Sequence, residues 1–203
     1  SGTYAATIGD LSDSISWELD KSTGLLTITG SGPMPNWTDG GEASPWYDQR
    51  TSIRSLLVSS GITTIGSNAF KGCTYLSSVI LPDGITTIGD SAFYACTLSS
   101  SFTLPSSVNT IGNYAFYYCW NLTSVTIPDS VTSIGDYAFY YCSALQAVYY
   151  QGSIEDRSSI NICNYNNELS NATWYYGICK GEHTYSSDCD EQCNACPYPK
   201  RTT

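Results

Sequence analysis

Hydrophobic residues recur at a fixed interval through the middle of the chain. Three marks return every 23 residues: an Ile-Gly pair, an Ala-Phe pair and a cysteine. The marks begin at Ile65, Ile88, Ile111 and Ile134, at Ala69, Ala92, Ala115 and Ala138, and at Cys73, Cys96, Cys119 and Cys142. Several marks that keep one period indicate a repeated structural unit.

Each unit opens with a short alternation of apolar and polar residues, such as Val125 and Ile127 on either side of Thr126. A period of two over so few residues predicts a short β-strand with one buried face. Stacked units would place these strands in one parallel sheet, about 4.8 Å apart. We expect six rungs, at residues 56–58, 79–81, 102–104, 125–127, 148–150 and 172–174.

The second half of each unit predicts a short helical segment. A polar residue that favours helix N-caps follows the glycine, and Ala, Phe and Cys then share one face of a helical turn. The N-cap candidates are Ser67, Asp90, Asn113 and Asp136. The phenylalanines should stack as one buried column, and the cysteines should be small buried side chains rather than redox or metal groups.

One unit departs from the pattern, because Leu98 comes one place early and Ser99 takes the expected leucine position. This shift predicts a local distortion. At the N-terminal end, alternation in residues 15–19 and 26–28 predicts a β-hairpin cap, and the Gly- and Pro-rich residues 31–45 predict a loop. We therefore divide the chain into a cap (1–50), repeats (51–175) and a Cys/His-rich tail (176–203).

The repeat motif Ile-Gly-x-x-Ala-Phe-x-x-Cys-x-x-Leu-x-x-Val-x-Leu-Pro, seen best from Ile111 to Pro128, resembles the BspA-like (Treponema-type) leucine-rich repeats of bacterial surface proteins. The resemblance covers roughly residues 46–175. It implies an α/β solenoid, a right-handed leucine-rich-repeat coil with short parallel β-strands on the concave face. It also implies an exported protein that attaches to host proteins or other cells, and it carries no catalytic residues.

The net charge of the chain disfavours two classes of binding partner. Eight Lys and Arg against 18 Asp and Glu give a net charge of −10, which disfavours nucleic acid and anionic membrane surfaces. No apolar run approaches the roughly 20 residues that span a bilayer, so we expect no membrane insertion. Neither a signal peptide nor an anchor is visible in the sequence, and we expect a secreted or cell-surface location.

The outward positions of the predicted rungs are the candidate binding residues. They are nearly uncharged, and five of them form a central row: Leu57, Ile80, Thr103, Thr126 and Tyr149. This row is either a groove for a protein or glycoprotein ligand or an inert face of residues that suit strands. We favour binding around Leu57, Ile80 and Tyr149, because exposed apolar groups are typical of interaction sites.

Tyrosines also repeat at the 23-residue period, as Tyr94, Tyr117 and Tyr140, as Tyr114 and Tyr137, and as Tyr118 and Tyr141. A rigid aromatic set suits recognition, but packing between neighbouring units explains the repetition equally well.

The tail gathers His183, Cys189, Cys193 and Cys196, a set that suits a structural zinc site. Zinc would leave Cys163 and Cys179 as an even pair, whereas disulfides alone would leave one odd thiol among the cysteines outside the repeats. An iron–sulfur site is excluded because the necessary barrel domain is absent. Zinc, disulfides and a disordered tail stay open; four protein ligands would in any case close a zinc site to catalysis.

These observations favour an exported bacterial interaction or adhesion module that binds a host or neighbouring-cell protein through the repeat surface. The alternative is a structural spacer in a larger exported protein, without a ligand of its own. We do not expect an enzyme: the one histidine lies in the cysteine cluster, and no nucleophile motif or groove-facing carboxylate pair is present.

Overall fold

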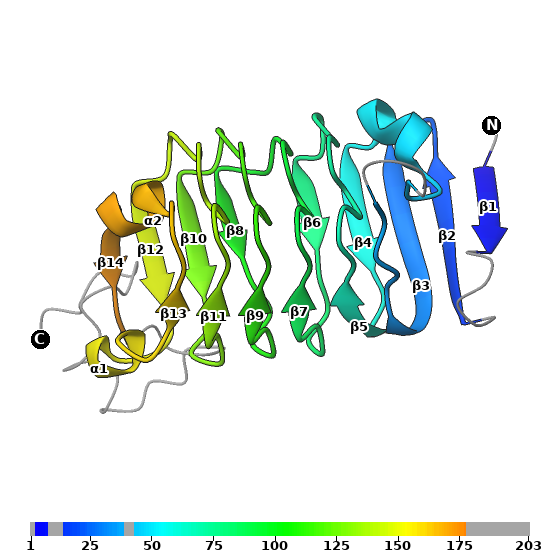
Figure 1. Cartoon of the computed structure of the whole chain (residues 1–203). Helices are drawn as coiled ribbons and strands as arrows, with labels where there is room; N and C mark the ends of the chain where they lie inside the picture. Colours follow the sequence, from blue (N-terminus) through cyan, green and yellow to red (C-terminus); the bar gives the residue numbers. More distant parts are fainter. Residues whose placement is uncertain (1–2, 8–13, 39–42, 178–203) are drawn as a thin grey trace, which may run out of the picture.

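The computed structural model describes residues 3–7, 14–38 and 43–177 (Figure 1). In these ranges the chain winds as a stack of coils, and each repeat coil adds a strand to each of two parallel ladders. The predicted solenoid of short parallel strands is therefore confirmed.

The first ladder holds the predicted rungs, and its outward side is called the rung face below. Its strands are β4 (Ser55–Val58), β6 (Ser78–Ile80), β8 (Ser101–Thr103), β10 (Ser124–Ile127), β12 (Ala147–Tyr150) and β14 (Thr173–Tyr175). Each observed rung lies within one residue of its predicted bounds. Inward residues such as Val125 and Val148 pair directly across neighbouring strands and are buried.

The last rung has a different register from the predicted one. The sequence aligned Ala172 with Val148, but the structure pairs Trp174 with Val148. The short helix α2 (Asn167–Asn171) causes the shift, because it takes up chain before the strand begins. Leu169 is the buried residue of that helix.

A second parallel ladder, which the sequence did not reveal, runs along the solenoid. Its strands are β5 (Gly61–Ile65), β7 (Thr87–Ile88), β9 (Thr110–Ile111), β11 (Ser133–Ile134) and β13 (Asn161–Ile162). The isoleucine of each Ile-Gly mark is its buried residue, and Ile88 for example pairs with both Ile65 and Ile111. Most of these strands span only two residues, too few for an alternation to show.

The predicted helical segments are wrong; the chain forms consecutive turns instead. Alternate amides bond within a coil and to the next coil: Cys119 N donates to Phe116 O at 3.2 Å, whereas Phe116 N donates to Ala138 O at 2.8 Å. Tyr114 and Tyr118 have φ values of 56° and 63°, in the left-handed region that interrupts a right-handed helix. Bonds between coils thus replace the bonds of a helix.

Three of the four polar residues predicted as N-caps join coils through their side chains, whereas Ser67 donates through its backbone N to Asn36 Oδ1 at 2.7 Å. Asp90 Oδ1 accepts a hydrogen bond from Asn113 N at 2.7 Å, and Asn113 Oδ1 accepts one from Asp136 N at 2.8 Å. Asp136 Oδ1 in turn accepts from Asn164 N at 2.7 Å. We call Asp90, Asn113 and Asp136 the Asx ladder; each side chain satisfies the amide of the following coil.

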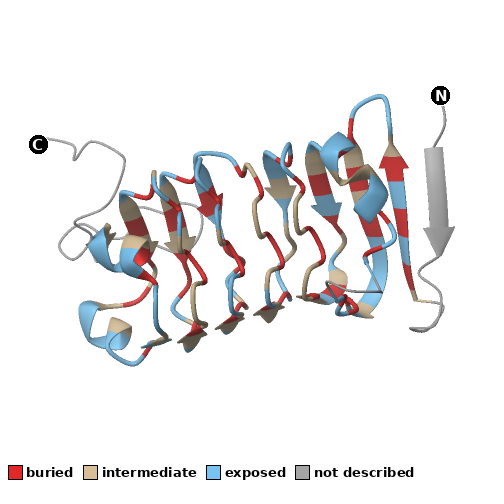
Figure 2. Ribbon diagram, turned by 45° about the horizontal axis from the view of Figure 1, so that its top comes forward, coloured by how far each residue is buried: buried red, intermediate tan, exposed pale blue. Residues whose placement is uncertain are grey.

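One continuous hydrophobic core fills the space inside the coils (Figure 2). Phe70, Phe93, Phe116 and Phe139 stack in sequence with ring centroids 5.4, 5.5 and 5.1 Å apart. The predicted phenylalanine column is confirmed, and Trp46 extends it toward the N-terminal end by stacking 5.6 Å from Phe70.

The expected distortion is present as a break in the first ladder. Within the described residues β6 pairs with β4 and β8 pairs with β10, but β6 and β8 do not pair. Leu98 fills the core position, so the chain between it and Phe102 has one residue more than in the next unit, from Leu122 to Val125. Because β7 and β9 still pair, the loss of strand pairing is confined to the first ladder, and Ser99 N still donates to Ser77 O at 2.9 Å beside the break.

The ends differ from the middle. The predicted N-terminal hairpin is confirmed as β2 (Ile15–Asp20) and β3 (Leu25–Pro33), and β1 (Thr3–Thr7) adds an unpredicted antiparallel strand. Strand β3 pairs with both β4 and β5, so it starts both ladders.

The predicted loop at residues 31–45 begins later than expected, because β3 continues through Pro33. A 3-10 helix, η1 (Tyr47–Ser52), follows it. The α-helices of the described residues are α1 (Ile154–Arg157) and α2, and neither approaches the length that crosses a bilayer.

Candidate interaction surfaces

The five predicted binding residues occupy equivalent outward positions on successive rungs. Leu57 pairs with Ile80, and Thr126 pairs with both Thr103 and Tyr149. The break between β6 and β8 therefore divides the row into an aliphatic pair and a group of three.

Exposure differs along this row. Leu57 is 38% and Ile80 60% exposed, Thr103 is exposed, and Thr126 and Tyr149 are half-buried. Tyr149 also stacks on Tyr175 at 5.2 Å. The sequence missed Tyr175 as a member of the row because the last rung had been placed in the wrong register.

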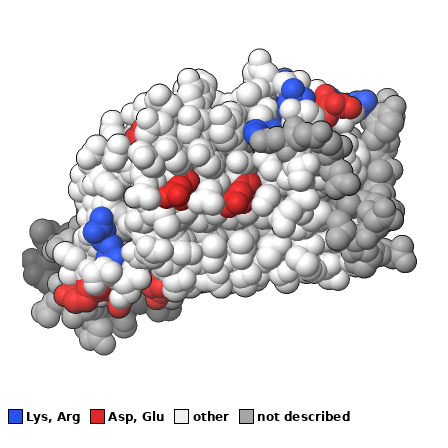
Figure 3. Space-filling view, in the orientation of Figure 1, with Lys and Arg blue, Asp and Glu red and all other residues white. Residues whose placement is uncertain are grey.

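Few charged groups lie between the two ends of the solenoid. From Ser55 to Tyr150 the chain carries five charged residues, which are Lys71, Asp83, Asp90, Asp129 and Asp136. The face in Figure 3 accordingly shows a broad uncharged middle with two acidic spots, and charges gather toward both ends. A partner on the middle of the solenoid therefore meets mainly hydroxyl, aromatic and aliphatic groups.

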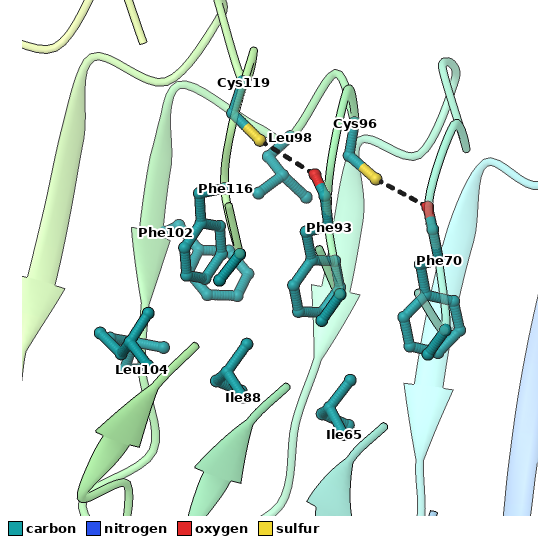
Figure 4. Close-up of a cluster of buried hydrophobic side chains, with 14 of the residues drawn as sticks. Ile65, Phe70, Ile88, Phe93, Cys96, Leu98, Phe102, Leu104, Phe116 and Cys119 are labelled. Atoms are coloured by element: carbon teal, nitrogen blue, oxygen red, sulfur yellow. Dashed lines mark hydrogen bonds between the residues drawn. The ribbon is translucent and has the colours of Figure 1, made fainter. Parts of the chain in front are cut away.

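The repeated cysteines form a buried column rather than a reactive site. Cys96 Sγ donates to Phe70 O at 3.1 Å and Cys119 Sγ donates to Phe93 O at 3.2 Å, so each thiol bonds to the preceding coil (Figure 4). Burial raises the pKa of the Cys142 thiol to about 12. A protonated thiol is a poor nucleophile and metal ligand, and the interpretation of these cysteines as core residues is confirmed.

The tyrosines gather on the turn segments in stacked columns. One column is Tyr114–Tyr137–Tyr165, with centroids 4.9 and 4.2 Å apart. A second is Tyr94–Tyr117–Tyr140, at 4.8 and 5.8 Å, and Tyr118 and Tyr141 form an edge-to-face pair at 5.4 Å. We call these eight residues the tyrosine array.

The structure of the array is compatible with both interpretations of the repeated tyrosines, packing between coils and recognition of a ligand. The stacks confirm packing between coils, yet Tyr118 and Tyr141 stay 48% and 47% exposed. Tyr165 is 54% exposed and was missed by the sequence search, because it follows Tyr137 by 28 residues instead of 23. The array is both a structural seam and an accessible surface.

A small pocket of about 160 Å³ lies where the cap meets the first repeat coils. Trp37, Tyr47, Asn68 and Lys71 contribute to its walls. Asn68 donates through Nδ2 to Trp37 O at 2.7 Å, and its buried Oδ1 has no hydrogen-bond partner. Lys71 Nζ also lies 4.9 Å from the centre of the Tyr94 ring, so the pocket borders the tyrosine array.

The predicted zinc ligands His183, Cys189, Cys193 and Cys196 lie outside the described residues. In the ranges that the structure does describe, no group of three or more His, Cys, Asp or Glu side chains could hold a metal ion.

The coil geometry defines the class: a leucine-rich-repeat solenoid whose middle carries few charged side chains. The family model of the BspA type leucine rich repeat region matches residues 45–170 in six copies. The chain therefore belongs to the BspA-type leucine-rich-repeat family.

Solved structures agree with this assignment. A leucine-rich repeat protein from Eubacterium ventriosum ATCC 27560 is 29% identical with a TM-score of 0.59, and the match covers 74% of this chain and 44% of that protein. The T. pallidum leucine rich repeat protein is 29% identical with a TM-score of 0.51, covering 69% of this chain and 70% of that one. The chain thus spans less than half of the Eubacterium protein. No curated protein matches the chain.

Proposed function

We propose that this chain is an exported interaction module that binds a host or neighbouring-cell protein through the rung face. The observation that carries the proposal is the pair Leu57 and Ile80, two exposed aliphatic side chains that lie side by side on a hydrogen-bonded ladder. Exposed apolar groups held in a fixed geometry bind at a low entropic cost, and Tyr149 supplies an aromatic anchor further along the row.

An export location is supported by the family and by the sparsely charged surface. Leucine-rich repeats generally serve as binding modules. The residues that recur in every repeat of this chain, Ile, Ala, Phe and Cys, are buried core residues, which supports binding rather than catalysis. The partner should bind with a weak dependence on salt, because few charges on the rung face would be neutralised.

The test compares ligand retention by variants of the rung face and by variants of the tyrosine array. Ile80→Asp with Tyr149→Asp should abolish retention of a ligand from a host cell-surface protein fraction, because binding would bury unpaired charge. Tyr114→Asp with Tyr137→Asp in the tyrosine array should leave retention of the same ligand unchanged. Binding should also change little between 50 and 500 mM NaCl.

The reverse result, loss with the array pair and not with the rung pair, would remove the rung face from consideration. Equal retention by the wild type and both variants would place the ligand outside both surfaces and so also overturn the proposal. No retention by the wild type would favour the alternative, a spacer of a longer protein without its own ligand.

A further inference from the structure

The tyrosine array has a surface chemistry that the rung-face proposal does not use. Neighbouring rings lie almost parallel, at 4° for Tyr114 and Tyr137, 9° for Tyr137 and Tyr165, and 11° for Tyr94 and Tyr117. These stacks cover ring faces with other rings of the array. What the array offers a ligand is chiefly ring edges and phenol hydroxyls.

The exposed residues of the array offer hydrogen-bonding hydroxyls to a ligand. Tyr141 is 47% and Tyr165 54% exposed. A phenol hydroxyl has one proton to donate and lone pairs that can accept.

The spacing of the array selects the conformation of a linear ligand. The steps between rings on adjacent coils are 4.9 and 4.2 Å from Tyr114 to Tyr165, and 4.8 and 5.8 Å from Tyr94 to Tyr140. Two coils therefore advance about 9–11 Å. A polyproline II helix advances about 9.3 Å in one turn of three residues. A β-strand repeats its side-chain direction after about 6.8 Å, which does not match this spacing.

Charge restricts the ligand further. The array contains no charged residue, but Asp136 directly precedes Tyr137 and Glu168 Oε1 accepts a hydrogen bond from Tyr141 N at 2.9 Å. Asp90 lies in the coil of Tyr94, and Lys71 and Arg50 are cations near that end. The surroundings therefore carry more negative than positive charge and would repel an acidic ligand.

We propose that the tyrosine array binds a neutral or basic proline-rich peptide segment in the polyproline II conformation, which lies along the stack of coils. Proline has no backbone N–H and offers only its carbonyl as an acceptor, so the hydroxyl protons of Tyr141 and Tyr165 meet a ligand that presents acceptors. Every third residue of the peptide would meet an equivalent position two coils further on.

The test uses a synthetic peptide of twelve prolines with one lysine at each end, titrated into the whole chain by calorimetry. Tyr141→Phe with Tyr165→Phe keeps the rings and removes two hydroxyls. Each hydroxyl should contribute about fivefold in Kd, so the double variant should bind roughly 25-fold more weakly. Tyr75→Phe, which is exposed but outside the array, is the matched control and should bind like the wild type.

Further variants distinguish peptide binding by the tyrosine array from ligand binding by the rung face. Ile80→Asp with Tyr149→Asp should bind the proline peptide normally, and thermal unfolding should show that every variant is folded. The proposal fails if the wild type does not bind at millimolar peptide, or if the double Phe variant binds as well as Tyr75→Phe. It also fails if a Gly-Ser peptide of equal length or a neutral β-glucan oligosaccharide binds more tightly.

Discussion

Phe116 lies in the middle of the aromatic column, with a stacked phenylalanine on each side. Phe116→Ala should lower the free energy of unfolding by about 3–5 kcal/mol, because it leaves a cavity in a closely packed core. Urea denaturation measures this loss. Tyr75→Ala, at an exposed position, should cost only about 0.5 kcal/mol, and equal losses for the two variants would contradict the packing described for the column.

Because of the buried cysteines, the free energy of unfolding should decrease as the pH rises in the alkaline range. Burial raises the pKa of the Cys73 thiol from 9.0 to about 12; the unfolded chain therefore ionises first as pH rises. The stabilising effect is complete below about pH 9 and is lost as pH rises from 9 to 12. The loss per thiol reaches roughly 1.4 kcal/mol for each pH unit in that window.

Alkylation tests the same residues in the native protein. Iodoacetamide at pH 8.5 should modify Cys163, which is half-buried, and leave Cys73, Cys96, Cys119 and Cys142 unmodified until the protein unfolds. Peptide mapping by mass spectrometry reads the outcome. Labelling of these four buried cysteines at the rate of Cys163 would show that the cysteine column is open to solvent.

Among the elements, the Asx ladder alternates charged and neutral side chains. Asn113 separates Asp90 from Asp136, and each is bonded to the next coil. Asn113→Asp should therefore place three carboxylates at successive coils and lower stability by about 1 kcal/mol per neighbour at low salt. The loss should shrink in 1 M NaCl, which screens the repulsion.

Asp90→Asn is the control for this prediction, because it keeps an acceptor and removes a charge. Its urea midpoint should not fall. A loss in Asn113→Asp that persists unchanged at high salt would instead indicate that the hydrogen bond itself had been broken.

The sequence predicted the rungs well because an inward residue of a four-residue strand, such as Val125, is bulky and its neighbours are not. It also located the distortion, since an early leucine must displace the chain that follows. The second ladder could not be predicted in this way, because a strand as short as Thr110–Ile111 contains no alternation.

The turn segments show why a spacing can mislead. Ala, Phe and Cys at successive positions i, i+1 and i+4 fit one face of a helix, but the same spacing fits consecutive turns whose amides bond to the next coil. The left-handed backbone at Tyr114 decides between the two, and a tyrosine gives no sign of it in the sequence. The outward positions of the central row could be predicted from the strand alternation, and binding there stays a prediction. The stacking that adds Tyr165 to the tyrosine columns needed the coordinates.

At the scale of the whole molecule, the prediction of a zinc site in the C-terminal tail can be tested without the structure of the coils. Protein purified without chelators should contain about one zinc ion per chain by elemental analysis if His183, Cys189, Cys193 and Cys196 bind it. Cys193→Ser with Cys196→Ser should remove that zinc. Metal-free wild-type protein with these thiols free would end the zinc hypothesis, and protein with these thiols oxidised would favour disulfides.

The Asx ladder also bears on how such a gene can grow. Each coil bonds to the next through groups that recur every 23 residues, so an in-frame duplication of one unit supplies a partner for every bond. Copying the unit that carries Asn113 keeps the two carboxylates apart, whereas copying the unit of Asp136 sets like charges on adjacent coils. Unequal recombination should therefore be tolerated best when it copies a neutral unit or a charged and a neutral unit together.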